Sequence, residues 1–336
     1  MSNSEANPVN WRPDARAVME RIRPAIERVE RIRVMAIGKK AKAKGRTFVV
    51  LGIGILVALV VLASGSGNAP AALVVAVVSG ITGIITYLVT HGGATGAYRD
   101  IFKREVFQSA VREAVPGMTY SPGSMIPEDS FKRGGLFKSR IDRYSGEDCF
   151  SGKIGATELI FSELHVERED TSTDSKGNTT STWVTVFKGI YLIADFHKEF
   201  RCRVTIVPDV AEANFGWIGR KMQGISGNLV RLESPEFEKA FKVTADDPLA
   251  ARYLLTPDMQ ERFLALRGEW SPNLCAVLTD SCLHIAIPKN EDWFEPDISS
   301  PAGDVPILHG FLLRLMIVLR ITETLDLNTR LWTKRV

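Results

Sequence analysis

The sequence predicts an α+β protein in which a two-helix transmembrane hairpin precedes a cytoplasmic domain of antiparallel sheet and packed helices. Three observations support this fold class. Two apolar stretches without a charged residue, Phe48–Ala63 and Ala71–Thr90, are separated only by Ser64–Pro70. Several later segments have the alternating or β-branched composition of strands. The apolar stretch Val305–Leu327 then predicts a helix that closes the domain.

The two apolar stretches predict a membrane hairpin over residues 47–91. A helix that spans a bilayer needs about 20 apolar residues. The second stretch meets this length, and the first does so when Thr47 and Ser64–Gly65 are included. Two adjacent uncharged runs disfavour a buried hairpin in a soluble protein. A cleaved signal peptide is disfavoured because 46 residues precede Thr47, where the predicted hairpin begins.

Basic residues indicate how this hairpin is oriented. Lys and Arg near membrane spans favour the cytoplasmic side, and the loop Ser64–Pro70 is uncharged, so both chain termini are expected in the cytoplasm. The spans hold no charged residue, which argues against an ion path. The flanking basic residues are Lys39, Lys40, Lys42, Lys44 and Arg46 before the first span, and Arg99, Lys103 and Arg104 after the second.

Small residues recur four positions apart in both spans, a spacing that lets helix backbones approach closely in lipid. They are Gly54 and Ala58 in the first span and Ala76 and Gly80 in the second, with Ser79 and Gly83 beside them. We expect these residues to pack the two helices of the hairpin on each other. The alternative is a seam between copies in an oligomer.

Residues 1–46 form a basic N-terminal arm. They hold twelve Lys and Arg against five Asp and Glu, a net charge of +7. Since the whole chain has a net charge of +3, the other 290 residues have a net charge of −4. The basic balance therefore does not indicate nucleic-acid binding by the main domain.

Apolar residues from Val18 to Ile32, spaced three or four apart, predict a helix with an apolar stripe, which Pro24 kinks or restarts. Two interpretations of this stripe are open: it lies on the anionic membrane surface, or it packs on a partner helix or on the protein's own domain. A helix that is merely solvated is the third alternative. The basic residues expected at the membrane surface are Arg21, Arg28, Lys39, Lys40, Lys42, Lys44 and Arg46.

A stalk and linker, residues 92–135, are expected before the cytoplasmic α+β domain, residues 136–330. Gly96–Val115 predicts the stalk helix, which ends at Pro116-Gly117. Proline at a first helical position predicts helices that begin at Pro235, Pro248 and Pro257. Strands are expected over Asp148–Ile154, Thr157–Arg168, Trp183–Phe196, Phe200–Pro208, Leu229–Leu232, Phe241–Thr244, Asn273–Thr279 and Cys282–Pro288.

The polar segment Asp170–Thr182 predicts a hairpin tip, either a mobile surface turn or, as the alternative, a binding loop. Val305–Leu327 is expected to pack on the domain and not to span the membrane, because His309, Arg314 and Arg320 interrupt it. Consecutive strands with short turns imply an antiparallel sheet covered by helices. A pleckstrin-like barrel with inserted helices is the alternative.

Several motifs together resemble a known family. Phe187–Phe200 fits the pattern FKG-x5-DF-x-K-x-F, and Ser151–Gly155, Pro235–Glu238 and Ala251–Pro257 fit as well. The chain therefore resembles a family of uncharacterised bacterial membrane proteins, a domain of unknown function with two N-terminal spans and a cytoplasmic α+β domain. The resemblance covers about residues 90–330 and the layout of the hairpin. It implies the bacterial inner membrane as the location and a LemA-type membrane protein as a partner, but no known activity or cofactor.

No familiar catalytic or metal-binding motif is present in the sequence. There is no Walker loop, Gly-x-Ser-x-Gly or His-Glu-x-x-His motif, and the histidines and cysteines lack metal-ligand spacing. The densest polar set is Asp195, His197, Lys198 and Glu199, with Arg252 further along. A catalytic cluster is the minority interpretation; a turn oriented by Asp195 and a structural ion pair for Arg252 are favoured.

We therefore expect no metal, no cofactor and no enzymatic activity. The expected role is a membrane-anchored interaction or scaffold module that contacts the bilayer and binds a membrane-protein partner or a second copy of itself. An enzyme with an unrecognised site and a structural membrane oligomer are the alternatives.

Overall fold

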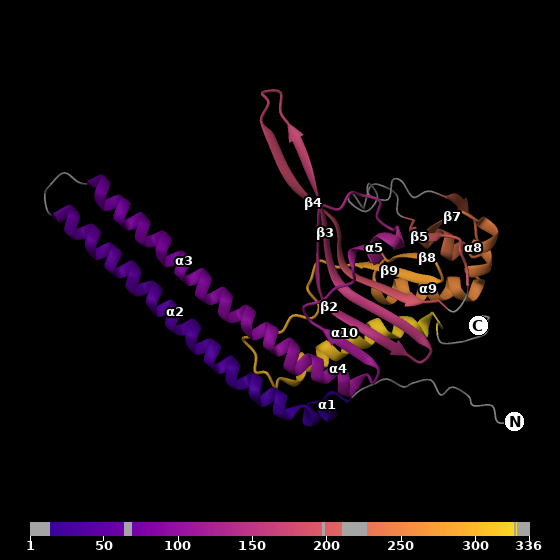
Figure 1. The fold of residues 1–336 in the computed structure, drawn as a ribbon, viewed down its shortest axis with the longest axis horizontal. Coiled ribbons are helices and arrows are strands. Elements are labelled where there is room, and N and C mark those ends of the chain that lie inside the picture. Colours follow the sequence, from indigo (N-terminus) through magenta and orange to yellow (C-terminus); the bar gives the residue numbers. More distant parts are fainter. Residues whose placement is uncertain (1–13, 64–68, 197–198, 210–226, 326, 328–336) are drawn as a thin grey trace. The chain divides into compact units, whose positions relative to one another are not determined.

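The computed structural model describes residues 14–63, 69–196, 199–209, 227–325 and 327 (Figure 1). These residues form two compact units, each assembled from segments that are distant in the sequence. The sheet unit consists of Val111–Phe294 and the described part of Gly310–Val336. The hairpin unit consists of Asp14–Ala110 and Glu295–His309.

The sheet unit contains one nine-stranded antiparallel sheet in the order β1-β2-β3-β4-β9-β8-β5-β7-β6. This confirms the α+β class and the antiparallel sheet, and an open sheet replaces the alternative of a barrel. The strands are β1 (Met118–Ser121), β2 (Arg143–Ile154), β3 (Thr157–Thr173), β4 (Thr179–Asp195), β5 (Val204–Pro208), β6 (Asn228–Val230), β7 (Phe241–Ala245), β8 (Cys275–Thr279) and β9 (Cys282–Pro288).

Helices cover both faces of this sheet. Phe311 of α10 (Val305–Thr324) packs near Phe150, which stacks on Phe161. Phe161 pairs with Leu192 across β3 and β4, so the neighbouring Tyr191 points to the opposite face, where Phe131 of α5 (Glu128–Gly134) contacts it. Burial on both faces explains why β5 and β8 are buried along their whole length.

Three helices of the sheet unit begin where proline and capping residues predict. They are α7 (Pro235–Ala240), α8 (Pro248–Leu254) and α9 (Pro257–Trp270). Ser234, Asp247 and Thr256 each accept a hydrogen bond from a backbone N–H in the first turn. A capping side chain satisfies a backbone donor that the helix leaves free, and proline at the next position costs no hydrogen bond.

Strands β3 and β4 extend beyond their neighbours as a two-stranded ribbon, visible in Figure 1. The ladder continues to Thr173 and Thr179, so most of the predicted tip Asp170–Thr182 is strand and not turn. The remaining five-residue turn is ordered by Asp174, whose carboxylate accepts hydrogen bonds from the backbone N–H groups of Lys176 and Asn178. These bonds lower the pKa of the Asp174 carboxyl.

The hairpin unit is helical. Its elements are α1 (Ala15–Arg21), α2 (Arg23–Ala63), α3 (Ala69–Phe102) and the π-helix η1 (Lys103–Phe107); α4 (Gln108–Ala114) follows across the boundary with the sheet unit. A new helix begins at Arg23 with Pro24 in its first turn, which is one of the two outcomes expected for this proline. The predicted stalk is continuous with the second apolar stretch, because α3 runs through residue 91 without interruption.

By length and composition, two helices of the described residues are able to cross a membrane, α2 and α10, and α3 holds a shorter apolar segment, Leu73–Ile85. In the sheet unit, the α10 side chains Phe311, Leu315 and Val318 are buried. This burial agrees with the prediction that the C-terminal helix packs on its domain.

Candidate functional site: the hairpin and its base

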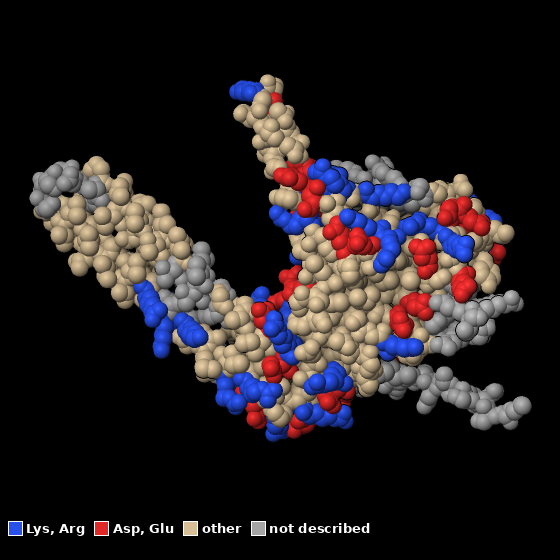
Figure 2. Space-filling model, in the orientation of Figure 1, with Lys and Arg blue, Asp and Glu red and all other residues tan. Residues whose placement is uncertain are grey.

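The outer parts of α2 and α3 present an apolar surface without charged residues. Phe48 is 63% exposed and Leu73 is 67% exposed. Figure 2 shows no Lys, Arg, Asp or Glu on the described outer part of the hairpin. An exposed apolar surface of this extent requires an apolar environment or a partner that covers it. The large exposed side chains are Phe48, Val49, Ile53, Ile55, Leu56, Val57, Leu59, Val60 and Leu62 on α2, and Leu73, Val74, Val77, Val78, Ile81, Ile84 and Ile85 on α3.

A narrow seam of small residues joins α2 to α3. A Cβ atom added at Gly54 would lie 2.3 Å from the Cβ of Ser79, so the backbones approach too closely there for a side chain at residue 54. Ala58 is also buried, and Gly83 lies against Leu51 on α2.

Two of the predicted packing residues do not lie in this seam. Ala76 is exposed, and a Cβ added at Gly80 would meet nothing within 4 Å. The expectation that these residues pack the hairpin is therefore corrected to Ser79 and Gly83. Each helical residue rotates the side chain by about 100°, which turns residues 76 and 80 to one side of the seam.

The apolar stripe of the N-terminal arm is covered by protein. Val18, Ile22, Ile26 and Val29 are all buried. A stripe that is already buried cannot also insert into a membrane surface, so an arm lying on lipid through this stripe is corrected to an arm that packs on the protein itself.

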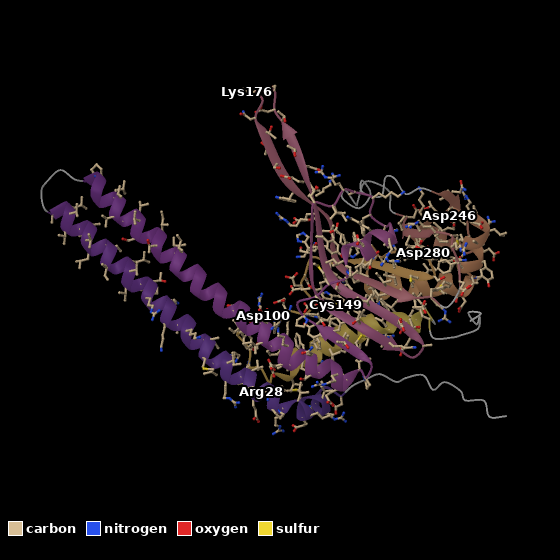
Figure 3. The ribbon with its side chains drawn as sticks, viewed as in Figure 1. Arg28, Asp100, Cys149, Lys176, Asp246 and Asp280 are labelled. Carbon is tan, nitrogen blue, oxygen red and sulfur yellow. The ribbon has the colours of Figure 1, made fainter. Side chains whose placement is uncertain are left out.

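The basic residues predicted for the membrane surface occupy exposed positions. Arg21, Lys39, Lys42, Lys44 and Arg46 are exposed, as is Arg28, which Figure 3 labels and which pairs with Glu105 of η1 at 2.8 Å. Lys40 lies on α2, and its side chain is outside the described set. A basic belt therefore precedes the apolar surface of α2.

The segment Glu295–His309 binds the base of the hairpin through polar contacts. Glu30 of α2 accepts a hydrogen bond from the backbone N–H of Ala302 at 2.7 Å. Arg33 binds the same carboxylate at 2.7 Å and donates to the carbonyl of Ile298 at 3.3 Å. These bonds to Arg33 and Ala302 lower the pKa of the Glu30 carboxyl.

A buried lysine forms the second part of this contact. Lys103, whose side chain is 3% exposed, lies 2.5 Å from Glu295, and Arg99 lies 3.1 Å from the same carboxylate. Tyr98 is buried on α3 near Arg33 and Glu30, and burial raises the pKa of its hydroxyl to about 12. Sequence patterns gave no indication of these contacts, because their partners are up to 272 residues apart.

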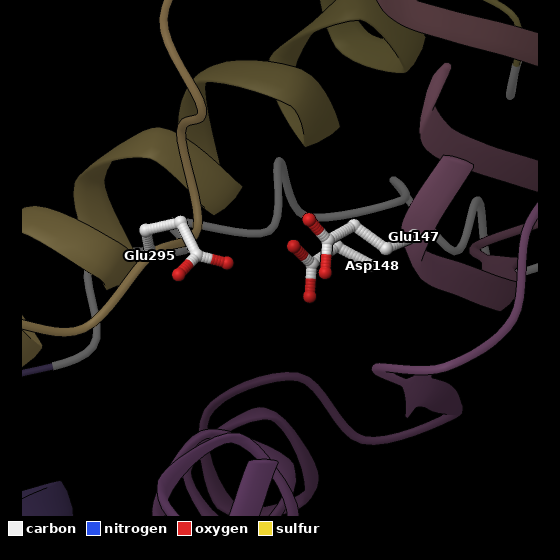
Figure 4. A group of neighbouring side chains, drawn as sticks. All are labelled: Glu147, Asp148 and Glu295. Carbon is white, nitrogen blue, oxygen red and sulfur yellow. The ribbon is translucent and has the colours of Figure 1, made fainter. Parts of the chain in front are cut away.

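The sheet unit holds two buried polar pairs that the sequence did not reveal. Asp148 of β2 is fully buried at a β-bulge with φ 57°, and its carboxylate accepts a hydrogen bond from the hydroxyl of Tyr120. Glu147, beside it in Figure 4, is exposed. Glu295, the third carboxylate in that view, belongs to the hairpin unit.

The second pair is Tyr191 of β4 and His284 of β9, with 3.2 Å between the hydroxyl and Nδ1. Burial, followed by the charges of Arg203 and Arg133, lowers the pKa of His284 to about 4. Gly134 of α5 packs against this pair, since a Cβ at residue 134 would lie 2.2 Å from the Tyr191 hydroxyl oxygen.

The predicted polar cluster is not assembled within the described residues. Asp195 ends β4 opposite Cys282, whereas Arg252 lies on α8 and donates to the carbonyl of Arg231 at 3.4 Å. His197 and Lys198 lie outside the described residues. Arg252 therefore makes a backbone contact where an ion pair was expected.

An open pocket of about 480 Å³ lies near the turn between β8 and β9. Glu199, Phe200, Arg201 and Ser281 line it. The hydroxyl of Ser281 accepts the backbone N–H of Phe200, so it serves to hold the loop.

Comparison with known proteins identifies one domain in the chain. A domain of the family described as "Protein of unknown function (DUF3137)" is found at residues 185–327. This supports the resemblance to a domain of unknown function, over a narrower range than residues 90–330. No curated protein and no solved structure matches the chain.

Proposed function

We propose that this chain is a membrane-anchored, non-catalytic interaction module whose hairpin holds the sheet unit at the cytoplasmic face of a bacterial inner membrane. The observation that carries the proposal is the uncharged apolar surface of α2 and α3. Full burial of one large aliphatic side chain is worth about 1.5–3 kcal/mol. The exposed side chains of the hairpin together therefore favour a bilayer over water by roughly 20 kcal/mol.

The charge pattern supports one orientation. The exposed belt from Lys39 to Arg46 precedes the apolar part of α2, and Arg99 and Lys103 follow that of α3. Both sets belong on the cytoplasmic side by the positive-inside rule, whereas the uncharged loop Ser64–Pro70 crosses the membrane easily. The proposed topology has two spans and both termini in the cytoplasm.

The proposed role is binding because the chain offers an apolar anchor and a large folded surface, and the residues that the structure describes form no recognised catalytic arrangement. The sheet unit would bind a membrane-protein partner, with lipid headgroups as the second class of ligand. A LemA-type protein, which the family resemblance implies, is one such partner.

Membrane insertion and topology can be tested with variants of the full chain that carry one accessible cysteine, since Cys149 and Cys275 are buried. Cys202 and Cys282 are first replaced by serine, and cysteine is then introduced at Ser66 or at Lys176. In intact spheroplasts, a membrane-impermeant maleimide should label residue 66 only, and after lysis it should label both. Labelling of residue 176 in intact spheroplasts, or release of the protein from membranes by alkaline carbonate, would contradict the proposal.

The binding role is tested by crosslinking in native membranes, gentle detergent extraction and mass spectrometry. A stoichiometric membrane protein or a retained anionic lipid is the expected result. Purified particles that hold neither would refute the binding role and leave the anchoring result unaffected.

A further inference from the structure

One edge of strand β4 has no partner strand over its outer part, Thr179–Phe187, among the described residues. On the other side β4 pairs with β3 along its full length, from Thr179 to Ala194. Strand β9 pairs with β4 only from Asp195 back to Gly189, because β9 ends at Pro288. The last bond on this side is donated by the Lys289 N–H to the Lys188 carbonyl, at 3.0 Å. In Figure 1 the ribbon continues well past this point.

The composition of this free edge favours strand pairing. Thr179–Thr185 contains no charged residue and no proline, and all of its residues except Ser181 are β-branched or aromatic. A β-bulge at Val186 ends the regular stretch. Natural proteins usually protect a free edge with charge, proline or a covering segment, and this edge has none of them among the described residues.

The opposite edge of the same ribbon is protected at its base, near Glu167 and Glu169. On β3, the backbone N–H of Glu169 donates to the Asp142 carboxylate at 2.8 Å, and the Glu169 carbonyl accepts from Arg140 at 2.8 Å. The backbone N–H of Asp142 also donates to the Glu167 carbonyl at 3.0 Å. These contacts occupy backbone groups of Glu167 and Glu169 that another strand would use on β3, whereas no described residue occupies the corresponding groups of Thr179–Thr185 on β4.

We propose that Thr179–Thr185 of β4 is a dimerisation edge, at which the same segment of a second copy of this chain adds as an antiparallel strand. The pairing follows a two-fold axis at Thr182, which places Thr179 opposite Thr185 of the second copy and Thr180 opposite Val184. The axis at Thr182 gives the longest overlap within the regular stretch. An isologous contact of this kind is the commonest form of homo-oligomer interface.

A second copy fits this edge better than an unstructured peptide. Its segment is uncharged, so no like charges face each other across the axis. It is also held extended by β3 and by the ordered turn at Asp174, so pairing costs little conformational entropy. The product is a four-stranded sheet, which is more stable in water than two separate two-stranded ribbons. This inference does not depend on the membrane anchor.

The test uses the full chain in native membranes and in detergent, with Cys202 and Cys282 replaced by serine. Single cysteines are introduced at Thr180, Thr182 or Val184 of β4 and, as the control, at Thr171 on the β3 edge. Under mild oxidation, Thr182→Cys should form a disulfide dimer, and the flanking positions should do so weakly because each faces a different residue of the second copy. Thr171→Cys should stay monomeric.

A charge test separates pairing from a folding defect. Thr182→Lys places like charges at the axis and should abolish the dimer, whereas Thr171→Lys, with the same added charge on the other edge, should leave the dimer intact. Mixing Thr182→Lys chains with Thr182→Glu chains should restore a dimer, which a merely unfolded ribbon cannot do. Equal crosslinking at residues 171 and 182, no crosslinking at any β4 position, or failure of the mixture to recover would overturn the proposal.

Discussion

We expect the buried pair of Tyr191 and His284 to make the stability of the sheet unit fall in acid. His284 is 5% exposed on β9, and its Nδ1 faces the Tyr191 hydroxyl of β4. Arg133 at the end of α5 and Arg203 before β5 add positive charge near the ring, and Asp280 in the turn before β9 opposes them. Burial is the largest effect, and together these groups lower the pKa of His284 to about 4.

The sign and size of the effect follow from linkage. An unfolded chain binds a proton at residue 284 below its ordinary pKa of 6.5, whereas the folded chain does so only below about 4. Between these pH values the unfolded state binds more protons, so the free energy of unfolding falls as the pH is lowered. At 1.36 kcal/mol for each pH unit, the loss from His284 is about 3 kcal/mol and is complete near pH 4.

The assay is urea unfolding of the full chain in detergent, followed by tryptophan fluorescence at several pH values between 7 and 4. The His284→Gln variant lacks the titrating group, so its unfolding free energy should rise relative to wild type by about 3 kcal/mol as the pH falls through this range. Carboxyl groups titrate in both proteins, and their contribution cancels in this difference. His165→Gln, a partly exposed position on β3, serves as the control. Parallel pH profiles for wild type and His284→Gln would refute the reasoning.

Three further outcomes are expected. Gly54→Leu should lower the free energy of unfolding of the hairpin in detergent by about 1–3 kcal/mol, because its Cβ would lie 2.3 Å from Ser79 of α3. Gly80→Leu is the control and should be tolerated, because a side chain at residue 80 points into open space. Asp148→Ala removes a buried acceptor and should cost about 1–3 kcal/mol in the same urea assay as His284→Gln. Glu295→Gln removes the carboxylate beside buried Lys103 and should speed hydrogen exchange at the base of α3, unlike the exposed change Glu147→Gln. Equal tolerance of both leucines, or unchanged unfolding and exchange, would contradict the respective contacts.

Local chemistry made much of the fold predictable from the sequence. Ser234, Asp247 and Thr256 mark helix starts because capping depends on residues within one turn. The antiparallel sheet followed from β-rich segments joined by short turns. The predicted length of the β3–β4 ribbon was wrong. A Thr- and Ser-rich segment is compatible both with a polar turn and with an exposed strand until its cross-strand partner is known.

Contacts between distant segments could not be predicted in this way. No pattern around Arg33 indicates that its partner is the carbonyl of Ile298, 265 residues away. The same limit applies to Tyr191 and His284, which meet only because β9 pairs with β4. In the hairpin, spacing identified small residues, but the rotation of the helix decided that Ser79 and not Ala76 faces α2.

The matched domain, residues 185–327, makes structural contacts with residues outside the match. The match begins at residue 185, inside β4, so β3, which forms the whole ladder on one side of that strand, lies outside it. The match also contains Glu295–His309, which binds Glu30 and Lys103 of the hairpin unit. Separating residues 185–327 would expose the backbone groups of β4 and remove the partners of Glu295. The domain of unknown function in this chain therefore depends for its backbone pairing on the strand before it, and for the partners of Glu295 on the hairpin helices.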